Sequence, residues 1–210
     1  NPDSTNNKTV DSTSDNSAVT SNSQKSPQDL STDSNMGGSA AAAKGDANLE
    51  IVNDINKDGI PNPCALISTK TIAKSLGIDA EYILTKDDTS TVSQKQRTCF
   101  FKWEEDDIPN AGMLVQVSKN PVEEVPTYFT FMVESLRSQG ERDMNKTVVK
   151  YNQWLGHGDD ASYSTELGKY VWRVDNDWLI MLAFNATMSE TKQQKVADKF
   201  YKEIMENMKL

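Results

Sequence analysis

Apolar and polar positions divide the chain into two unequal parts. In residues 1–48, Ser, Thr, Asn and Asp dominate, and Val and Leu are isolated. A segment of this kind cannot bury enough apolar surface to offset the ~1–2 kcal/mol per residue that ordering a backbone costs. The pattern predicts a disordered N-terminal tether over residues 1–48, a linker or turn over 49–63, and a single folded domain over 64–210.

Residues 64–77 and 120–140 have the spacing of apolar residues that gives a helix one buried face. Ser68 or Thr69 is expected to cap the first helix by accepting a backbone N–H, and a glycine follows its last turn. Asn120 is expected to cap the second helix. The predicted inward stripe of this second helix consists of Val125, Phe129, Met132 and Leu136, with Tyr128 beside it.

Residues 189–210 predict a third, amphipathic helix. Thr187 and Glu190 have the spacing of a capping box, in which each side chain satisfies a backbone N–H of the other residue. The buried face is expected to consist of residues at successive steps of four, Val196, Phe200, Ile204 and Met208, with Ala197 and Tyr201 adjoining.

Several segments have the alternating or continuously apolar pattern of strands. The residues from Trp178 to Phe184 are apolar at every position, which predicts a central strand covered on both faces. Asn176 and Asp177 tolerate positive φ and are expected to form the tight turn before this strand. The predicted strands are 97–103, 112–119, 146–151, 161–167, 169–175 and 177–186.

The order of these elements is helix, two strands, helix, several strands and helix. Antiparallel strands with helices segregated from them define the α+β class. We therefore expect one α+β domain.

Composition and charge narrow the function classes. The formal net charge of −9, from 31 acidic and 22 basic residues, disfavours nucleic-acid binding, which usually requires a basic face. The same charge disfavours binding to an anionic membrane surface. No apolar run approaches the ~18–20 residues that span a bilayer. Contact with a membrane is therefore expected only through a lipid anchor.

The chain begins with Asn1 and has no initiating Met. This start suggests a processed N-terminus from which a signal peptide has been removed. A lipidated Cys directly before Asn1 would suit a polar tether that links a membrane anchor to a folded domain. We expect an exported, membrane-tethered protein.

Cys64 and Cys99 are the two cysteines of the chain, and His157 is its one histidine. These residues are too few for a closed zinc site, and the spacing of the cysteines excludes a C-x-x-C redox pair. In an exported chain the expected state is a structural disulfide. The alternative is two separate buried thiols in a cytosolic protein, and the long polar tether argues against it.

The stretches NPCALISTKTIAKSLG, RTCFFKW and WLGHGDDASY precede a strand pair and an amphipathic helix. With these motifs, residues 62–210 resemble a family of small secreted bacterial lipoprotein domains of unknown function. That family has a D-P-C-x-L-L opening, a second Cys followed by an aromatic residue, and a G-L-G-D-x-A-like segment. Here NPC replaces D-P-C, and His157 stands where the family usually has an apolar residue.

The resemblance implies a disulfide between Cys64 and Cys99 and a location in the periplasm or on the outer cell surface. It also implies a twisted antiparallel sheet with helices packed against it, like the folds of the photosystem-associated PsbP and the nuclear-import factor Mog1. Those folds serve as binding or scaffolding modules, so the resemblance supplies no catalytic residues.

Asp54, Asn56 and Asp58 stand at alternate positions before Gly59, as at the start of an oxygen-lined calcium loop. Position 12 of such a loop supplies a bidentate carboxylate, and here it is Ala65. A carboxylate from elsewhere in the chain would be needed to complete the shell. A calcium-stabilised extracellular module is therefore an alternative, and the favoured interpretation is a polar turn without a cofactor that leads into the disulfide.

His157 lies in the Gly-rich stretch 156–160 together with Asp159 and Asp160. A histidine beside a carboxylate can act as a base, so an uncharacterised hydrolase is a second alternative. The favoured interpretation is a non-catalytic loop whose glycines adopt positive φ, since no nucleophile accompanies the pair.

Trp103 and Trp178 are expected in the core because they lie on predicted strands. Trp154 lies in a predicted loop and is expected to be the most exposed of the four tryptophans. Exposed aromatic side chains often mark binding surfaces. A partner is therefore expected to contact Trp154 together with Tyr151 and His157.

The sequence thus favours a monomeric, non-catalytic binding or structural protein of the bacterial cell envelope. Its partner is expected to be a protein or a small ligand, and not nucleic acid.

Overall fold

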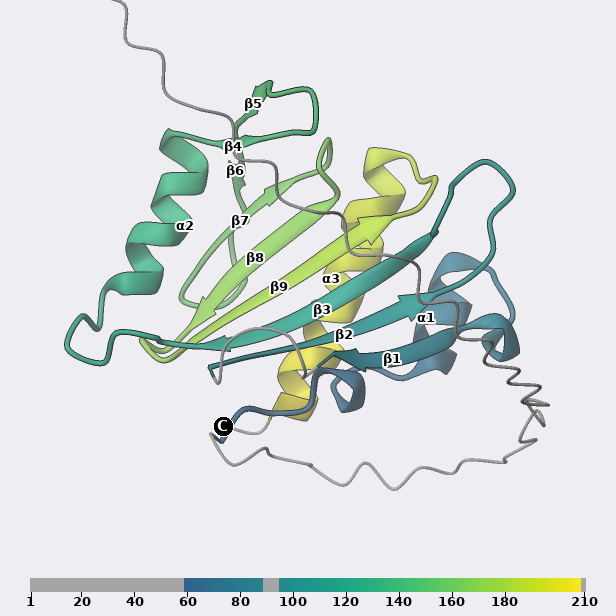
Figure 1. Ribbon diagram of the computed structural model, residues 1–210, viewed down its shortest axis with the longest axis horizontal. Coiled ribbons are helices and arrows are strands. Elements are labelled where there is room, and N and C mark those ends of the chain that lie inside the picture. The colour runs from purple at the N-terminus through teal and green to yellow at the C-terminus, as the bar shows by residue number, and fades with distance from the viewer. Residues whose placement is uncertain (1–58, 89–94, 209–210) are drawn as a thin grey trace, which may run out of the picture. The chain divides into compact units, whose positions relative to one another are not determined.

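The computed structural model describes residues 59–88 and 95–208 (Figure 1). Within these ranges the α-helices are α1 (Thr69–Leu76), α2 (Tyr128–Ser138) and α3 (Glu190–Met208), and the short 3₁₀ helices η1 (Pro63–Ala65) and η2 (Ala80–Tyr82) precede and follow α1. A small hairpin consists of β4 (Glu141–Arg142) and β5 (Val148–Val149). The strands of the main sheet are β1 (Leu84–Asp88), β2 (Gln96–Lys102), β3 (Gly112–Lys119), β6 (Asn152–Gln153), β7 (Asp160–Ser164), β8 (Lys169–Val174) and β9 (Trp178–Asn185).

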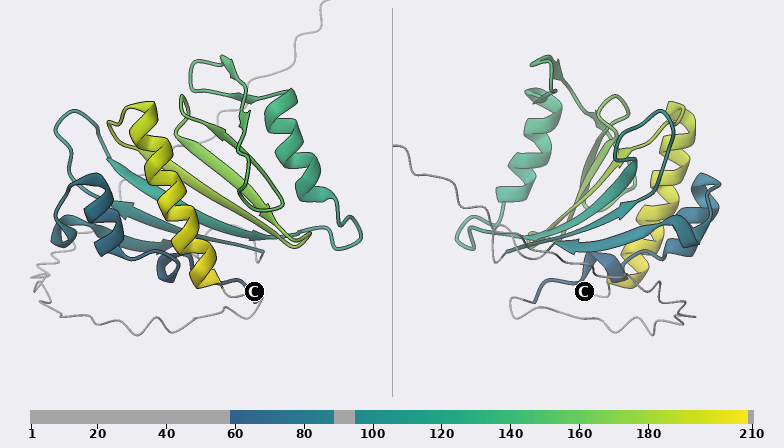
Figure 2. Two further views of the ribbon diagram at one scale, coloured as in Figure 1. Left: turned by 180° about the vertical axis from the view of Figure 1, so that it is seen from behind. Right: turned by 45° about the vertical axis from the view of Figure 1, so that its right-hand side comes forward.

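The main sheet has seven strands in the order β1-β2-β3-β9-β8-β7-β6, and every neighbouring pair is antiparallel. Helices α1 and α3 lie against one face of the sheet, and α2 lies on the other side (Figure 2). The predicted α+β class with an antiparallel sheet is confirmed. The tether predicted over residues 1–48 lies outside the described residues.

β9 is the central strand, and the face it turns toward the main core is buried along its length. On its other face Leu179 is buried but Met181 and Ala183 are only half-buried, so the predicted covering of both faces holds in part. Ile180 and Leu182 are fully buried in the main core, which includes residues of α1 and α3. Leu179 points to the opposite side, where it packs in a smaller cluster with Phe129 and Val133 of α2. The two clusters show that helices cover this part of the sheet from both sides.

α1 begins and ends at residues that the sequence singles out. The Ser68 side chain caps the helix by accepting the backbone N–H of Thr71 at 3.2 Å. Gly77 follows the last turn with a φ of 82°, in the left-handed region that glycine adopts without steric cost. Ile72 anchors the helix in the main core.

α3 buries the predicted stripe, but a different residue caps it. Ser189 Oγ accepts the backbone N–H of Lys192 at 3.3 Å. The predicted capping box of Thr187 and Glu190 is wrong, because the backbone N–H of Thr187 donates to Glu105 Oε1 at 3.1 Å and the helix starts later. The buried stripe is confirmed in Val196, Phe200, Ile204 and Met208.

α2 begins at Tyr128 and not directly after Asn120 as predicted. Asn120 organises an irregular turn: its Oδ1 accepts the N–H of Val122 at 2.9 Å, and its Nδ2 donates to the carbonyl of Val125 at 3.0 Å. Pro126 lacks an N–H and disfavours helical backbone at the residue before it, so the helix starts only after the proline.

The later start changes which side chains of α2 face the sheet. Phe129 and Val133 are buried, whereas Val125 is 38% and Met132 40% exposed. The predicted stripe is therefore wrong for Val125 and Met132. Val125 lies before the first helical turn, and Met132 lies on a flank of the face that Phe129 and Val133 define.

Three further details differ from the sequence pattern. β1 was not predicted, because it is an edge strand with mostly exposed side chains and no apolar alternation. The strand predicted over 146–151 is reduced to β5, since Lys146 adopts a φ of 65° in the turn after β4. In the β8–β9 hairpin the positive φ falls on Asp175, and not on Asn176 or Asp177.

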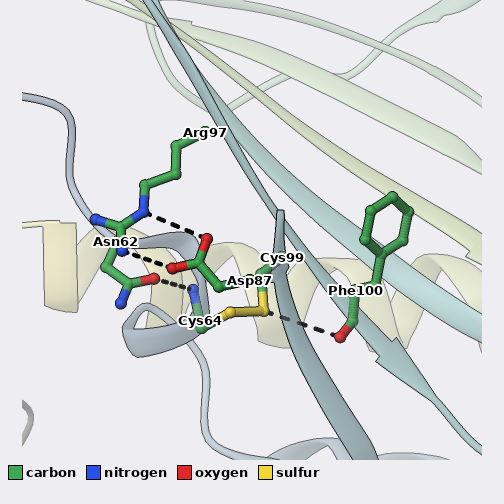
Figure 3. Close-up of a disulfide and its surroundings, with 6 residues drawn as sticks. All are labelled: Asn62, Cys64, Asp87, Arg97, Cys99 and Phe100. Atoms are coloured by element: carbon green, nitrogen blue, oxygen red, sulfur yellow. Dashed lines mark hydrogen bonds and ion pairs between the residues drawn. A yellow bond between two sulfur atoms is a disulfide. The ribbon is translucent and has the colours of Figure 1, made fainter. Parts of the chain in front are cut away.

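Cys64 and Cys99 form the predicted disulfide, which joins the turn before α1 to β2 (Figure 3). Asn62 Oδ1 accepts the backbone N–H of Cys64 at 3.0 Å and so orders this turn. Beside the disulfide, Arg97 Nη2 of β2 donates to Asp87 Oδ2 of β1 at 2.6 Å. The covalent bond and the ion pair together fix the start of the domain and the edge of the sheet.

Candidate functional site

The α2 side of the sheet is only partly covered by helix. α2 packs against the end of the sheet that holds β7 and β8, where Arg137 binds Asp160 Oδ1 and Oδ2 at 2.8 Å each. In Figure 1, α2 stands beside β7 and β8 and away from β1, β2 and β3. The part of this face that β2, β3 and the end of β9 around Ala183 form therefore lacks a covering helix among the described elements.

A row of apolar side chains crosses this uncovered half. The strand register pairs Phe100 with Leu114 and Leu114 with Ala183, so the three side chains point to the same side. Ala183 lies four positions after Leu179, which packs against α2, so the row faces the α2 side. All three residues are half-buried. We name this row and the depression over it the open-face site.

The depression at the open-face site has a volume of about 340 Å³. Its apolar lining includes Leu167 as well as the row itself. Gly112 also lines it, and a Cβ at this position would lie 2.5 Å from the backbone carbonyl oxygen of Phe101. A glycine is therefore required for the close approach of β2 and β3 at this end of the sheet.

Lysines border the apolar row on both sides. The register continues from Phe100 to Lys86 of β1 and from Ala183 to Lys169 of β8. Lys102 lines the depression, is exposed, and has no polar partner within the described part of the chain. The site therefore combines an apolar floor with a positively charged rim.

Glu141 holds Lys169 at this rim through an ion pair. Burial raises the pKa of Glu141, but hydrogen bonds from Lys169 and from the Tyr151 hydroxyl outweigh it and keep that pKa below its ordinary value. The Tyr151 hydroxyl donates to Glu141 Oε2 at 2.7 Å. Burial and this bond raise the pKa of Tyr151, so the phenol stays protonated and remains a donor.

Asn185, at the end of β9, also lines the depression and fixes the loop between β2 and β3. Its Nδ2 donates to the carbonyls of Pro109 and Asn110 at 3.2 and 3.0 Å. Asn110 adopts a φ of 57°, which asparagine tolerates better than most residues. Asn185 of β9 thus holds in place the loop backbone that forms the polar wall of the depression.

The three residues predicted to bind a partner do not form this site, and only two of them are brought together. Tyr151 is buried with Phe129 and Val133 on the α2 side. Trp154 belongs to the main core on the α3 side. His157 contacts Trp154, so the structure joins two of the three residues and separates Tyr151 from them.

Trp154 is 7% exposed, and the prediction that it would be the most exposed tryptophan is wrong. Its indole Nε1 donates to Asp198 Oδ1 of α3 at 3.2 Å, and its ring meets Tyr170, Trp172 and Tyr201 edge-on. The loop carries Trp154 inward because α3 supplies both an acceptor and an aromatic surface for it. Trp103 and Trp178 are buried as predicted.

His157 is held by a ring stack and by contacts at both of its ring nitrogens. It stacks on Trp154 with a centroid distance of 3.7 Å and an angle of 11°. Its Nε2 lies 3.1 Å from Asp198 Oδ1, and its Nδ1 lies 2.9 Å from the carbonyl oxygen of Leu155. Both ring nitrogens therefore face oxygen atoms, one of a carboxylate and one of the backbone.

The carboxylates that follow His157 in the sequence have other partners. Asp159 Oδ2 lies 3.3 Å from Arg173 Nη1, and Asp160 binds Arg137 of α2. The histidine–carboxylate pair on which the hydrolase alternative depends is thus formed with Asp198 and not with Asp159 or Asp160. The loop serves to connect β7, β8, α2 and α3.

The predicted calcium ligands Asp54, Asn56 and Asp58 lie outside the described residues. Gly59, which follows them, has a φ of 75°, in the left-handed region that glycine adopts without steric cost. Over the ranges 59–88 and 95–208, no group of three or more His, Cys, Asp or Glu side chains is arranged to hold a metal ion.

Comparison of the chain with models of known protein families, with curated proteins and with solved structures gives no match. In the part of the chain that the structure describes, no helix is both long and apolar enough to span a bilayer.

Replacing His157 with Ala is expected to lower the free energy of unfolding by about 1–2 kcal/mol, because the change removes the stack on Trp154 and leaves Asp198 with fewer donors. Denaturation in guanidinium chloride measures the difference. Asp159→Asn is the matched control and should change stability by less than about 0.5 kcal/mol, since this side chain is 48% exposed. Equal stability of His157→Ala and wild type would contradict a structural role for the ring.

Proposed function

We propose that the domain is a non-catalytic binding module of an exported protein, and that the open-face site holds an apolar ligand with a negative charge. The observation that carries the proposal is the row of Phe100, Leu114 and Ala183, which stays half-exposed between lysines on β1 and β8. A small ligand at this position would cover apolar surface that the fold itself leaves accessible to water.

The size of the site supports a small ligand. A volume of about 340 Å³ falls at the lower end of the ~300–1,000 Å³ range of small-molecule pockets. The lining combines apolar side chains with the polar residues Asn110 and Asn185, the mixture that orients a mainly apolar molecule.

The charge at the rim supports an acidic group on the ligand. Lys102 is exposed at the edge of the depression, and Lys86 and Lys169 end the apolar row. Lys169 already pairs with Glu141, so Lys102 is the cation best placed to meet an incoming anion. The chain as a whole carries a net charge of −9, so this group of lysines is a local exception. The lysines attract the negatively charged end of a ligand and so set its orientation in the site.

The disulfide between Cys64 and Cys99 supports export, because such bonds persist in oxidising compartments and are rare in the cytosol. The polar N-terminal stretch and the resemblance to secreted lipoprotein domains support a tethered location in the bacterial cell envelope. Within the proposed binding role, the tether would position the open-face site at a distance from the membrane.

Titration with 1-anilinonaphthalene-8-sulfonate, an aromatic anion that fluoresces in apolar surroundings, tests the proposal. The native protein is expected to bind it saturably, with one site and a Kd on the order of 10–100 µM, as the ligand efficiency of drug-sized molecules suggests. Leu114→Glu should weaken binding at least tenfold, since it places a carboxylate on the apolar floor.

Ser118→Glu is the matched control, because it adds the same charge to the same strand and face roughly 13 Å away. It should leave the Kd within about twofold of wild type, since its charge is screened beyond ~10 Å. Unfolding midpoints of the variants establish that each is folded. Equal affinity of Leu114→Glu and Ser118→Glu, or the lack of saturable binding to the native wild type, would refute the open-face site.

A further inference from the structure

A second concavity lies on the opposite side of the sheet, where the end of α1 meets the first half of α3. Figure 2 shows the two helices side by side, with α1 in blue and α3 in yellow. The concavity has a volume of about 490 Å³. Ser75 of α1 lines one side, and hydroxyl and lysine side chains from the first turns of α3 line the other. We name it the α1–α3 groove.

Three lysines of α3 point into this groove: Lys192, Lys195 and Lys199. Their spacing of three and four residues places them along one side of the helix. No aspartate or glutamate is among the residues that line the groove. The local charge of the groove is therefore opposite to the net charge of −9 that the whole chain carries.

The fold positions two of these lysines. Lys192 Nζ donates to the carbonyl oxygen of Leu76 at 3.2 Å, and Lys199 Nζ donates to Ser75 Oγ at 2.8 Å. Both acceptors belong to the last turn of α1, so the two ammonium groups are fixed at the edge of the groove. An ammonium group has three donors, and each of these bonds uses one of them. Each lysine keeps two donors for a further acceptor.

Lys195 lies between these two lysines, is exposed, and has no polar partner in the ranges 59–88 and 95–208. The hydroxyls of Ser189 and Thr191 lie at the start of α3 and line the same groove. The Ser189 oxygen accepts a backbone N–H, which leaves its own O–H as a donor. Several N–H and O–H donors from the first half of α3 therefore converge on the groove.

We propose that the α1–α3 groove binds a phosphate group. Phosphate oxygens are hydrogen-bond acceptors, so they match a groove lined by donors. Charge-assisted bonds from ammonium groups to phosphate oxygens are among the stronger hydrogen bonds in proteins. A volume of about 490 Å³ holds more than one phosphate, so the ligand is a pyrophosphate or a phosphate ester with a further polar part. The proposal does not depend on the open-face site, which lies across the sheet.

Isothermal titration calorimetry with sodium pyrophosphate at low ionic strength tests the proposal. The wild type is expected to bind one equivalent, and Lys195→Gln should weaken binding about fivefold, the effect of removing one exposed charge contact. Lys150→Gln is the matched control, because Lys150 is exposed, lies next to Tyr151 on the α2 side, and lines neither concavity. This control should bind like the wild type.

A second experiment identifies the source of the phosphate. Sedimentation with vesicles of phosphatidylglycerol, with phosphatidylcholine vesicles as the reference, measures recognition of a lipid headgroup. Binding of pyrophosphate alone that depends on Lys195 supports a soluble phosphate ligand, and vesicle binding that depends on Lys195 supports a headgroup. Lys195→Gln that behaves like wild type in both experiments, or no binding in either, would overturn the proposal.

Discussion

Reduction of the Cys64–Cys99 disulfide is expected to lower the free energy of unfolding by about 3–4 kcal/mol. The two cysteines are 35 positions apart, and the chain-entropy model assigns this magnitude to a loop of that length. For a domain of this size the loss corresponds to roughly 10 °C in the unfolding midpoint.

The position of the bond adds to its effect. Cys99 is fully buried on β2, next to the edge strand β1, and Cys64 holds the turn that precedes α1. Without the bond, the turn around Asn62 would keep its local hydrogen bond but lose its covalent attachment to the sheet. We expect the segment before α1 to loosen first, because noncovalent contacts alone would then hold it.

Guanidinium chloride unfolding with and without a phosphine reductant measures this difference. The double variant Cys64→Ala/Cys99→Ala should show the lower stability in both conditions, since it has no bond to reduce. Identical unfolding curves for the wild type in both conditions would show that the disulfide does not stabilise the domain.

Gly158→Ala is expected to lower the free energy of unfolding by about 3 kcal/mol. Gly158 has a φ of 58°, and a Cβ at this position would lie 2.3 Å from the backbone carbonyl oxygen of Arg173. That oxygen accepts the N–H of Asp159 at 2.9 Å, and the N–H of Gly158 donates to the Tyr201 hydroxyl at 2.7 Å. A methyl group would therefore push the loop away from both β8 and α3.

Gly156→Ala provides a matched control within the same loop. Gly156 has a φ of 80°, but no atom lies within 4 Å of a Cβ at this position. The substitution should cost about 1 kcal/mol, the cost of a left-handed conformation alone. Chemical denaturation of both variants measures the difference, and equal losses would refute the close approach of Gly158 to β8.

The elements with strong periodicity were predictable from the sequence. α3 and β9 each bury a pattern that is visible in the residues alone, because all of their buried positions are apolar except Gln193 of α3. The disulfide also followed from the presence of only two cysteines together with the expectation of export. In these cases local pattern and tertiary structure agree.

The elements that the sequence did not predict depend on contacts between distant residues. β1 is an edge strand whose exposed side chains carry no apolar alternation, so only its pairing with β2 defines it. Trp154 is buried because Asp198 and Tyr201, more than forty positions later in the sequence, come to lie beside it. No pattern around Trp154 itself indicates these partners.

The open-face site was missed for the same reason. Phe100 and Leu114 are paired directly between β2 and β3, but Ala183 joins them only because β9 inserts between β3 and β8 in the sheet. One signal was present in the sequence: Phe100 and Leu114 are apolar although they alternate with the buried residues Phe101 and Met113. Apolar residues on both faces of β2 and β3 indicate a second surface that needs a cover.

The most direct test of ligand binding at the open-face site is a ¹H–¹⁵N correlation spectrum recorded during titration with 1-anilinonaphthalene-8-sulfonate. The proposed function predicts that the largest shifts occur at the backbone amides of Phe100, Leu114 and Ala183 and their neighbours at that end of the sheet. Shifts confined to the α1–α3 groove or to the loop around His157, or no shifts at saturating ligand, would contradict it.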